Sequence, residues 1–157
     1  MSDVRTRLAA PEELARLAEL YDEWGYHGGI LPTDVVFVAE RDGACVGIVR
    51  RTREHETLML RGMYVAPSAR GQGVGSRLLA AFVRALDADP KIRHEPCYGI
   101  PFAHLERFYG QGGFGFVDES GAPAFLQDRI RRYRAEGHVV AVMRRSGAGS
   151  GDDRLRS

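Results

Sequence analysis

Lysine and cysteine are scarce in this chain, and long apolar runs are absent. Lys91 is the only lysine among 157 residues, which argues against lysine-dependent nucleotide loops. The two cysteines, Cys45 and Cys97, stand far apart and match no metal-ligand or redox spacing, so we expect buried reduced thiols and no metal site. No run approaches the roughly 18 apolar residues that a membrane-spanning helix needs, so we expect no membrane partner.

The remaining composition is that of an ordinary globular protein. Hydrophobic residues make up 44% and charged residues 27% of the chain, and the net charge of +1 gives no overall attraction to nucleic acid. The first residues contain no apolar signal core, so we expect a cytoplasmic protein. We expect one domain over residues 1–145 and a disordered tail over 146–157, where small and polar residues dominate.

Hydrophobic periodicity predicts a mixed α/β chain. Strands are expected at 3–8, 35–41, 44–50, 58–65, 96–100, 114–117 and 138–143. Helices are expected from Pro11 to Gly25, from the glycine-rich turn to about Asp87, and at 103–109 and 123–136. The Asp42-Gly43 pair predicts a hairpin, and a second reversal near residues 53–56 gives three antiparallel strands before the turn.

The most informative stretch is Arg70-Gly-Gln-Gly-Val-Gly75, between a predicted strand and a predicted helix. Its three glycines remove side chains from the backbone where the helix begins. The first N–H groups of a helix have no partner within it and carry partial positive charge. An anion can therefore approach them closely, and the stretch predicts a phosphate-sized site.

Other interpretations of this turn fit less well. A nucleotide phosphate loop requires a lysine after its last glycine, and Ser76 follows Gly75. A dinucleotide-binding turn requires a third glycine where Ser76 stands, after the first strand of a parallel unit, whereas hairpin strands precede this turn. A tight turn with only a structural role remains as an alternative.

The turn matches Arg/Gln-x-x-Gly-x-Gly/Ala, the pyrophosphate-binding turn of the GNAT (GCN5-related N-acetyltransferase) superfamily, and its flanking strand and helix resemble that family too. A second stretch, Phe108-Tyr-Gly-Gln-Gly-Gly-Phe114, lies about 35 residues further on and resembles the family's Phe-Tyr-x-x-x-Gly-Phe segment. The resemblance covers about residues 3–145. It implies an α/β GNAT fold, with a mixed, mostly antiparallel sheet of about seven strands flanked by helices, here with an extra helix between the last two strands.

The resemblance implies an acyl-CoA-dependent N-acetyltransferase, which moves an acetyl group from acetyl-CoA to a primary amine by direct transfer in a ternary complex. By the match, Met63, Tyr64 and Val65 pair through their backbone with the pantetheine arm, like an added strand. The backbone that would hold the pyrophosphate belongs to Arg70, Gly71, Gln72, Gly73, Val74, Gly75 and Ser76.

Tyr109 occupies the family's usual tyrosine position and is the candidate general acid, because a phenol can protonate a leaving thiolate and is uncharged at neutral pH. The resemblance also implies a backbone N–H of residues 63–65 as the oxyanion donor. The general base stays open between ordered water, Glu56 and His104, because Leu60-Arg-Gly-Met63 has no carboxylate where many relatives carry a glutamate.

The acceptor side is less determined. Trp24, Tyr26 and His27 lie in an irregular, aromatic stretch and are the candidate substrate residues. The Arg-rich helix 123–136 is a solvated face, a subunit contact in a homodimer, or a site for an anionic partner. We expect a small-molecule amine as acceptor. The alternatives are a protein lysine or N-terminal acetyltransferase and a non-catalytic acyl-CoA-binding module, which the missing carboxylate favours.

Overall fold

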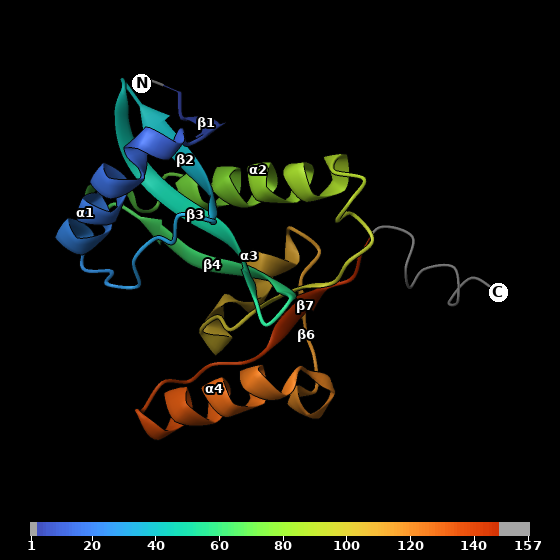
Figure 1. The fold of residues 1–157 in the computed structure, drawn as a ribbon. Coiled ribbons are helices and arrows are strands. Elements are labelled where there is room, and N and C mark those ends of the chain that lie inside the picture. Colours follow the sequence, from blue (N-terminus) through green and yellow to red (C-terminus); the bar gives the residue numbers. More distant parts are fainter. Residues whose placement is uncertain (1–2, 148–157) are drawn as a thin grey trace. The chain divides into compact units, whose positions relative to one another are not determined.

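The computed structural model describes residues 3–147 (Figure 1). Its helices are α1 (Leu14–Trp24), α2 (Val74–Ala88), α3 (Glu106–Gly110) and α4 (Ala124–Ala135). Its strands are β1 (Arg5–Leu8), β2 (Val35–Arg41), β3 (Ala44–Glu54), β4 (Thr57–Val65), β5 (Cys97–Gly99), β6 (Gly115–Phe116) and β7 (Met143–Arg145). Within residues 3–147, no helix combines the length and the apolar character needed to cross a membrane.

The described strands form a seven-stranded sheet in the order β1-β2-β3-β4-β5-β7-β6. β4 and β5 pair in parallel, whereas β1–β2, β2–β3, β5–β7 and β6–β7 pair antiparallel. The two early hairpins reverse at Asp42–Gly43 and His55–Glu56, where all four residues have positive φ, as the tight turns of twisted hairpins require. The predicted mixed, mostly antiparallel sheet is therefore confirmed.

The described residues group into two compact units. One consists of residues 3–53 and 60–85, and the other of residues 54–59 and 86–147. We call them the first and the second unit. The single domain expected over 1–145 stays a prediction, and most of the expected disordered tail, residues 148–157, lies outside the described residues.

The first unit packs one helix on each face of its strands, as Figure 1 shows for α1 and α2. Alternate side chains of a strand point to opposite faces. Val36 and Val38 of β2 belong with Tyr21 of α1 to one buried cluster. Phe37 lies between them in sequence and contacts Phe82 of α2, with 5.5 Å between ring centroids. Both helices are thus held by the hydrophobic stripes that the sequence predicts.

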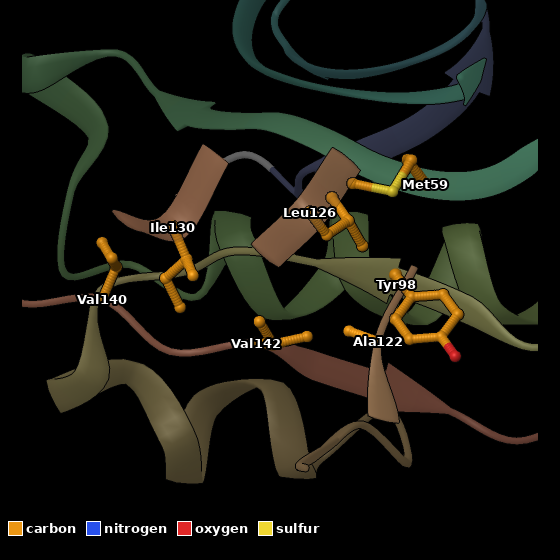
Figure 2. Close-up of a cluster of buried hydrophobic side chains, with 7 residues drawn as sticks. All are labelled: Met59, Tyr98, Ala122, Leu126, Ile130, Val140 and Val142. Carbon is orange, nitrogen blue, oxygen red and sulfur yellow. The ribbon is translucent and has the colours of Figure 1, made fainter. Parts of the chain in front are cut away.

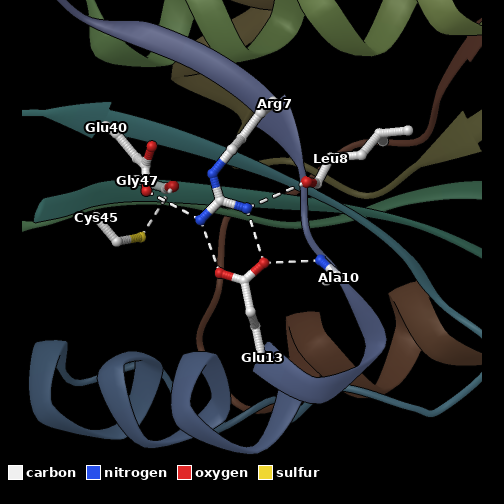
Figure 3. A network of polar contacts seen from close by, with 7 residues as sticks. All are labelled: Arg7, Leu8, Ala10, Glu13, Glu40, Cys45 and Gly47. Carbon is white, nitrogen blue, oxygen red and sulfur yellow. Dashed lines mark hydrogen bonds and ion pairs between the residues drawn. The ribbon is translucent and has the colours of Figure 1, made fainter. Parts of the chain in front are cut away.

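An ion-pair network fastens the start of α1 to the first two strands (Figure 3). Arg7 of β1 donates to both carboxylate oxygens of Glu13, each at 2.7 Å, and to Glu40 of β2 at 2.9 Å. Glu13 also accepts a bond from the Ala10 N–H at 2.7 Å. The bond from Arg7 is the main reason that the pKa of Glu13 falls to about 2. Nearby, burial raises the pKa of the free Cys45 thiol to about 11, as expected for an unreactive thiol.

The second unit is built around α4, which follows β6 and precedes β7 in the chain. Leu126 and Ile130 of α4 are four residues apart and therefore share one face of the helix. Both are fully buried. Figure 2 shows the cluster that they form with Met59, Tyr98, Ala122, Val140 and Val142. The predicted extra helix between the last two strands is confirmed.

The last strand is shorter and later than predicted. A strand was expected at 138–143, but β7 comprises Met143–Arg145. Val140 makes only an isolated bridge with Phe102, and the Ala141 N–H donates to the Pro101 carbonyl at 3.1 Å. The segment opposite it bends into a 3-10 turn at Ala103–Leu105. Regular strand pairing therefore begins only where Gly99 of β5 faces Met143. Within residues 138–142, Val140 and Val142 fill the core cluster, whereas Val139 is exposed.

Candidate functional site

The glycine-rich stretch forms a turn that leads from β4 into α2. After β4 ends at Val65, a 3-10 turn at Pro67–Ala69 precedes Arg70, whose backbone is extended. Gly71 and Gly73 both have left-handed backbones, with φ of +76° and +80°. This conformation strains residues that carry a Cβ, which explains why glycine stands at both positions. Apart from the glycine and its two chain neighbours, no heavy atom of the described residues lies within 4 Å of the place that a Cβ would occupy at either glycine.

The helix behind this turn is firmly anchored. Val74, Leu78, Leu79 and Phe82 are each no more than 1% exposed, so the start of α2 is fixed against the core of the first unit. The first turn of α2 contains no acidic residue that would compete with an anion for its N–H groups. An uncrowded backbone at the start of a fixed helix is the arrangement that binds phosphate groups.

The side chain of Arg70 lies back on the end of β4 instead of projecting from the turn. Its Nε–H donates to the Val65 carbonyl at 3.2 Å, and its guanidinium stacks over the Tyr64 ring at 5.0 Å. The Tyr64 hydroxyl in turn donates to the Trp24 carbonyl at 3.0 Å. The first unit therefore contains all the predicted cofactor-binding residues, 63–65 and 70–76, with the strand end and the turn tied together by Arg70.

The predicted substrate residues occupy three different environments at the end of α1 and just after it. Gly25 ends the helix with φ of +98°, and Trp24 before it is half-buried. Tyr26 turns inward, its ring centroid 4.5 Å from that of Tyr21 and 5.7 Å from that of Tyr64. His27 is exposed and hydrogen-bonded to Asp22. Tyr26 is thus half-buried among aromatic side chains of the first unit, whereas His27 lies on its surface.

A buried ion pair beside Tyr26 was missed by sequence reasoning. Arg50 of β3 donates to the Asp34 carboxylate at 2.8 Å and to the Tyr26 hydroxyl at 3.0 Å, and the side chains of Arg50 and Asp34 are 5% and 0% exposed. Strand alternation was the available signal, because Arg50 follows Ile48 by two residues and so shares its buried face. The sequence alone does not say that Asp34 supplies the counter-charge.

Tyr109 lies on α3 in the second unit. It is 6% exposed, and its ring contacts those of Phe108 at 4.9 Å and Phe114 at 6.2 Å. Its hydroxyl makes no hydrogen bond with any described residue of that unit. Burial raises the pKa of Tyr109, so the phenol keeps its proton throughout the neutral range.

The other titratable candidates of the second unit are exposed. Glu56 lies in the β3–β4 turn and His104 in the 3-10 turn before α3. Glu54, next to the β3–β4 turn, is paired with Arg129 of α4 at 2.6 Å. Over residues 3–147 no group of three or more histidine, cysteine, aspartate or glutamate side chains is placed to hold a metal ion.

Ion pairs neutralise most of the arginines on α4. Arg129, Arg131 and Arg134 have the carboxylates of Glu54, Asp128 and Glu119 as partners, and Arg132 lies over the Tyr133 ring. This pairing favours a solvated helix face over a site for an anionic partner. A homodimer contact through α4 stays a prediction.

Comparison with known proteins places this geometry in a family context. The acetyltransferase (GNAT) domain family matches residues 32–115, more than half of the chain. No curated protein matches the chain. Several solved structures match it.

N-acetylglutamate synthase from Neisseria gonorrhoeae, in complex with coenzyme A and N-acetyl-glutamate, is 20% identical with a TM-score of 0.64. The match covers 93% of this chain and 35% of that one, so this chain spans about a third of that protein's length. An acyl-CoA N-acyltransferase from Pseudomonas aeruginosa is 22% identical with a TM-score of 0.63, over 93% of this chain and 100% of that one. The PaiA N-acetyltransferase from Thermoplasma acidophilum, in complex with coenzyme A, is 15% identical with a TM-score of 0.59, over 92% and 99%.

These likenesses to solved structures show the fold, whereas the family match shows the family. The matched residues include both the glycine-rich turn and the segment that carries Tyr109. The chain therefore belongs to the GNAT acetyltransferase domain family, whose members use acetyl-CoA as co-substrate.

Proposed function

We propose that this chain is an N-acetyltransferase that moves the acetyl group of acetyl-CoA directly to the primary amine of a small molecule. The observation that carries the proposal is the turn of residues 70–73 before α2. Two left-handed glycines and a fixed, acid-free helix start form a backbone site suited to a pyrophosphate. The space where a Cβ would point is open at Gly71 and Gly73, which leaves room for a bound group beside the turn.

In this proposal the chain binds the co-substrate through its backbone. The N–H groups of residues 70–76 hold the pyrophosphate, and residues 63–65 at the end of β4 pair with the pantetheine arm. Acetyl-CoA supplies an activated acyl thioester. A backbone N–H of residues 63–65 donates to the thioester carbonyl oxygen, which stabilises the negative charge that develops there.

Tyr109 supplies the proton for the leaving sulphur. The amine nitrogen bonds to the carbonyl carbon, the C–S bond breaks, and the sulphur takes the phenolic proton. The Tyr109 phenol is protonated at neutral pH, and its hydroxyl makes no hydrogen bond within its unit, so a proton is available for transfer. Water receives the proton that the amine loses, since both Glu56 and His104 are exposed.

A small acceptor is supported by the aromatic side chains at the end of α1 and just after it. Trp24 and Tyr26 are half-buried and pack beside the cluster of the first unit instead of forming an open polar face. Of the three predicted substrate residues, the exposed His27 is the least supported. A panel of small amines, lysine peptides and free peptide N-termini, assayed by release of the CoA thiol, distinguishes this acceptor class from protein acetylation. Failure of every acceptor, with acetyl-CoA still bound, would favour a non-catalytic acyl-CoA-binding module.

The turn is tested by adding a negative charge to it. We expect Gly73→Glu to weaken acetyl-CoA binding, measured by calorimetry, by about tenfold to a hundredfold, because the carboxylate repels the pyrophosphate. Gly43→Glu is the matched control. Gly43 has the same φ of +80° and the same open surroundings, but it lies in the β2–β3 hairpin. Equal affinity in the two variants would refute the assignment of the turn.

The acid is tested by removing one oxygen atom. We expect Tyr109→Phe to lower kcat for acetyl transfer by about a hundredfold, with acetyl-CoA affinity unchanged within about twofold. Tyr133→Phe serves as the control, because Tyr133 is a half-buried tyrosine on α4 to which we assign no part in binding or transfer. Wild-type turnover in Tyr109→Phe would contradict the role of Tyr109 and leave the turn assignment untouched.

A further inference from the structure

The centre of β4 contains a backbone irregularity that the proposed mechanism has not used. Gly62 has a left-handed backbone, with φ of +66°, in the middle of a strand whose other residues are extended. Such a residue interrupts the regular strand geometry, as at a β-bulge. It immediately precedes Met63, the first residue that we expect to face the co-substrate with its backbone N–H.

A buried tyrosine holds the carbonyl of this glycine. The Tyr21 hydroxyl donates to the Gly62 carbonyl oxygen at 2.7 Å, across 41 positions in the sequence. Tyr21 is completely buried, and burial raises the pKa of its phenol, so the hydroxyl remains a donor at neutral pH. A Cβ at position 62 would lie 2.6 Å from this hydroxyl and 2.9 Å from Nε of Arg50. The space beside Gly62 is therefore too small for any larger residue.

The hydroxyl itself has little freedom to move. The Tyr21 ring lies 4.5 Å from the ring of Tyr26, and the Arg50 guanidinium lies over it at 5.9 Å. Arg50 is in turn bonded to Asp34 and to Tyr26, while its Nε–H has no hydrogen-bond partner among the described residues. Arg50 of β3 and Tyr26 just after α1 therefore hold the Tyr21 hydroxyl in place against the Gly62 carbonyl.

Fixing the Gly62 carbonyl also fixes the Met63 N–H. The two groups belong to one peptide unit, which is planar, and no cis peptide bond occurs in the described residues. In a trans peptide the C=O and N–H bonds point in opposite directions, so the Met63 N–H points away from the Tyr21 hydroxyl. A hydrogen bond accepted by the carbonyl also polarises the peptide and strengthens its N–H as a donor.

We propose that Tyr21 is a positioning residue for acetyl transfer, which holds and polarises the Gly62–Met63 peptide so that the Met63 N–H donates to the thioester carbonyl oxygen. The inference rests on the proposed function and selects one N–H among the three of residues 63–65. The competing interpretation is that Tyr21 only stabilises the first unit.

Tyr21→Phe separates these interpretations, because phenylalanine keeps the ring and loses only the hydroxyl. Ile48→Val is the matched control, since Ile48 lies in the same buried cluster and the change removes one methyl group without touching Gly62. We expect Tyr21→Phe to lower kcat about tenfold and to leave the Kd for CoA, which lacks the acyl carbonyl, within about twofold. The carbonyl stretch of bound ¹³C-acetyl-CoA should move toward its value in water. Ile48→Val should change none of these quantities.

A wild-type kcat with an unshifted carbonyl band in Tyr21→Phe would overturn the inference. A measurement on the protein without ligand tests the role of Tyr21 separately from the proposed acetyl transfer. The amide proton shift of Met63, observed by NMR, should change in Tyr21→Phe and not in Ile48→Val, and an unchanged shift would also overturn the inference. If the wild-type protein neither binds nor transfers acetyl, the proposed function fails, whereas the amide shift still decides whether Tyr21 controls the Met63 N–H.

Discussion

Replacing Gly62 by alanine should destabilise the protein by about 3 kcal/mol. The left-handed backbone costs a residue with a Cβ about 1–2 kcal/mol. The new methyl group would also stand 2.6 Å from the Tyr21 hydroxyl and 2.9 Å from Nε of Arg50. Neither group can stay in place, so the buried bond to the Gly62 carbonyl is lost, at a cost of about 1–3 kcal/mol.

Gly43→Ala isolates the backbone contribution. Gly43 has φ of +80°, similar to Gly62, but apart from its two chain neighbours no described residue has a heavy atom within 4 Å of the place of its Cβ. It should therefore lose only about 1 kcal/mol. Urea unfolding of both variants can be followed by the fluorescence of Trp24, the only tryptophan, which is half-buried in the same unit.

A double variant tests the cause of the difference. If the clash with the Tyr21 hydroxyl is responsible, Tyr21→Phe should relieve part of the cost, and the loss in Gly62→Ala/Tyr21→Phe should be at least 0.5 kcal/mol smaller than the sum of the single losses. Equal losses in Gly62→Ala and Gly43→Ala, or strict additivity in the double variant, would refute the reasoning that Tyr21 closes on this glycine.

Two further predictions concern the charges of the first unit. Asp34→Asn should lower the free energy of unfolding, measured in urea, by about 3–5 kcal/mol because it leaves the buried Arg50 without its counter-charge. Adding Arg50→Met should restore part of that stability. A double variant less stable than Asp34→Asn would contradict this explanation. The lowered pKa of Glu13 predicts stability that is fully present above its unfolded pKa near 4.5 and is lost as the pH falls toward about 2. Glu13→Gln should flatten that part of the pH–stability curve, by less than about 1 kcal/mol because the pair with Arg7 is partly exposed, and an unaltered curve would exclude the pair as its source.

Local sequence signals predicted much of the fold. The Asp42-Gly43 pair marks a hairpin because few residues tolerate its left-handed backbone, and the structure has that hairpin. Hydrophobic periodicity predicted a helix at 123–136, and the structure has α4 there with Leu126 and Ile130 buried. The start of β7 was predicted wrongly because an apolar run does not reveal whether a partner strand is straight enough to pair with it.

The candidate site was likewise only partly predictable from the sequence. The glycines of residues 70–75 predicted an anion site. The structure shows left-handed backbones at Gly71 and Gly73, and binding of an anion there stays a prediction. The candidates Tyr109 and Tyr26 were found as residues, but only the structure shows that the first is buried without a hydrogen-bond partner in its unit and that the second supports Arg50. Sequence reasoning gave no reason to connect Tyr21 with Gly62.

The sequence by itself determined the features whose causes lie within a few residues: the turn before α2, the hairpins, the helical stripes and the family to which they point. The tertiary structure alone decided which distant groups meet. Asp34 opposite Arg50, and the Tyr21 hydroxyl on the Gly62 carbonyl, depend on strand register and on how a helix lies on a sheet. Backbone preferences are local and can be read from neighbouring residues, whereas a buried polar contact exists only once packing has brought its two partners out of water.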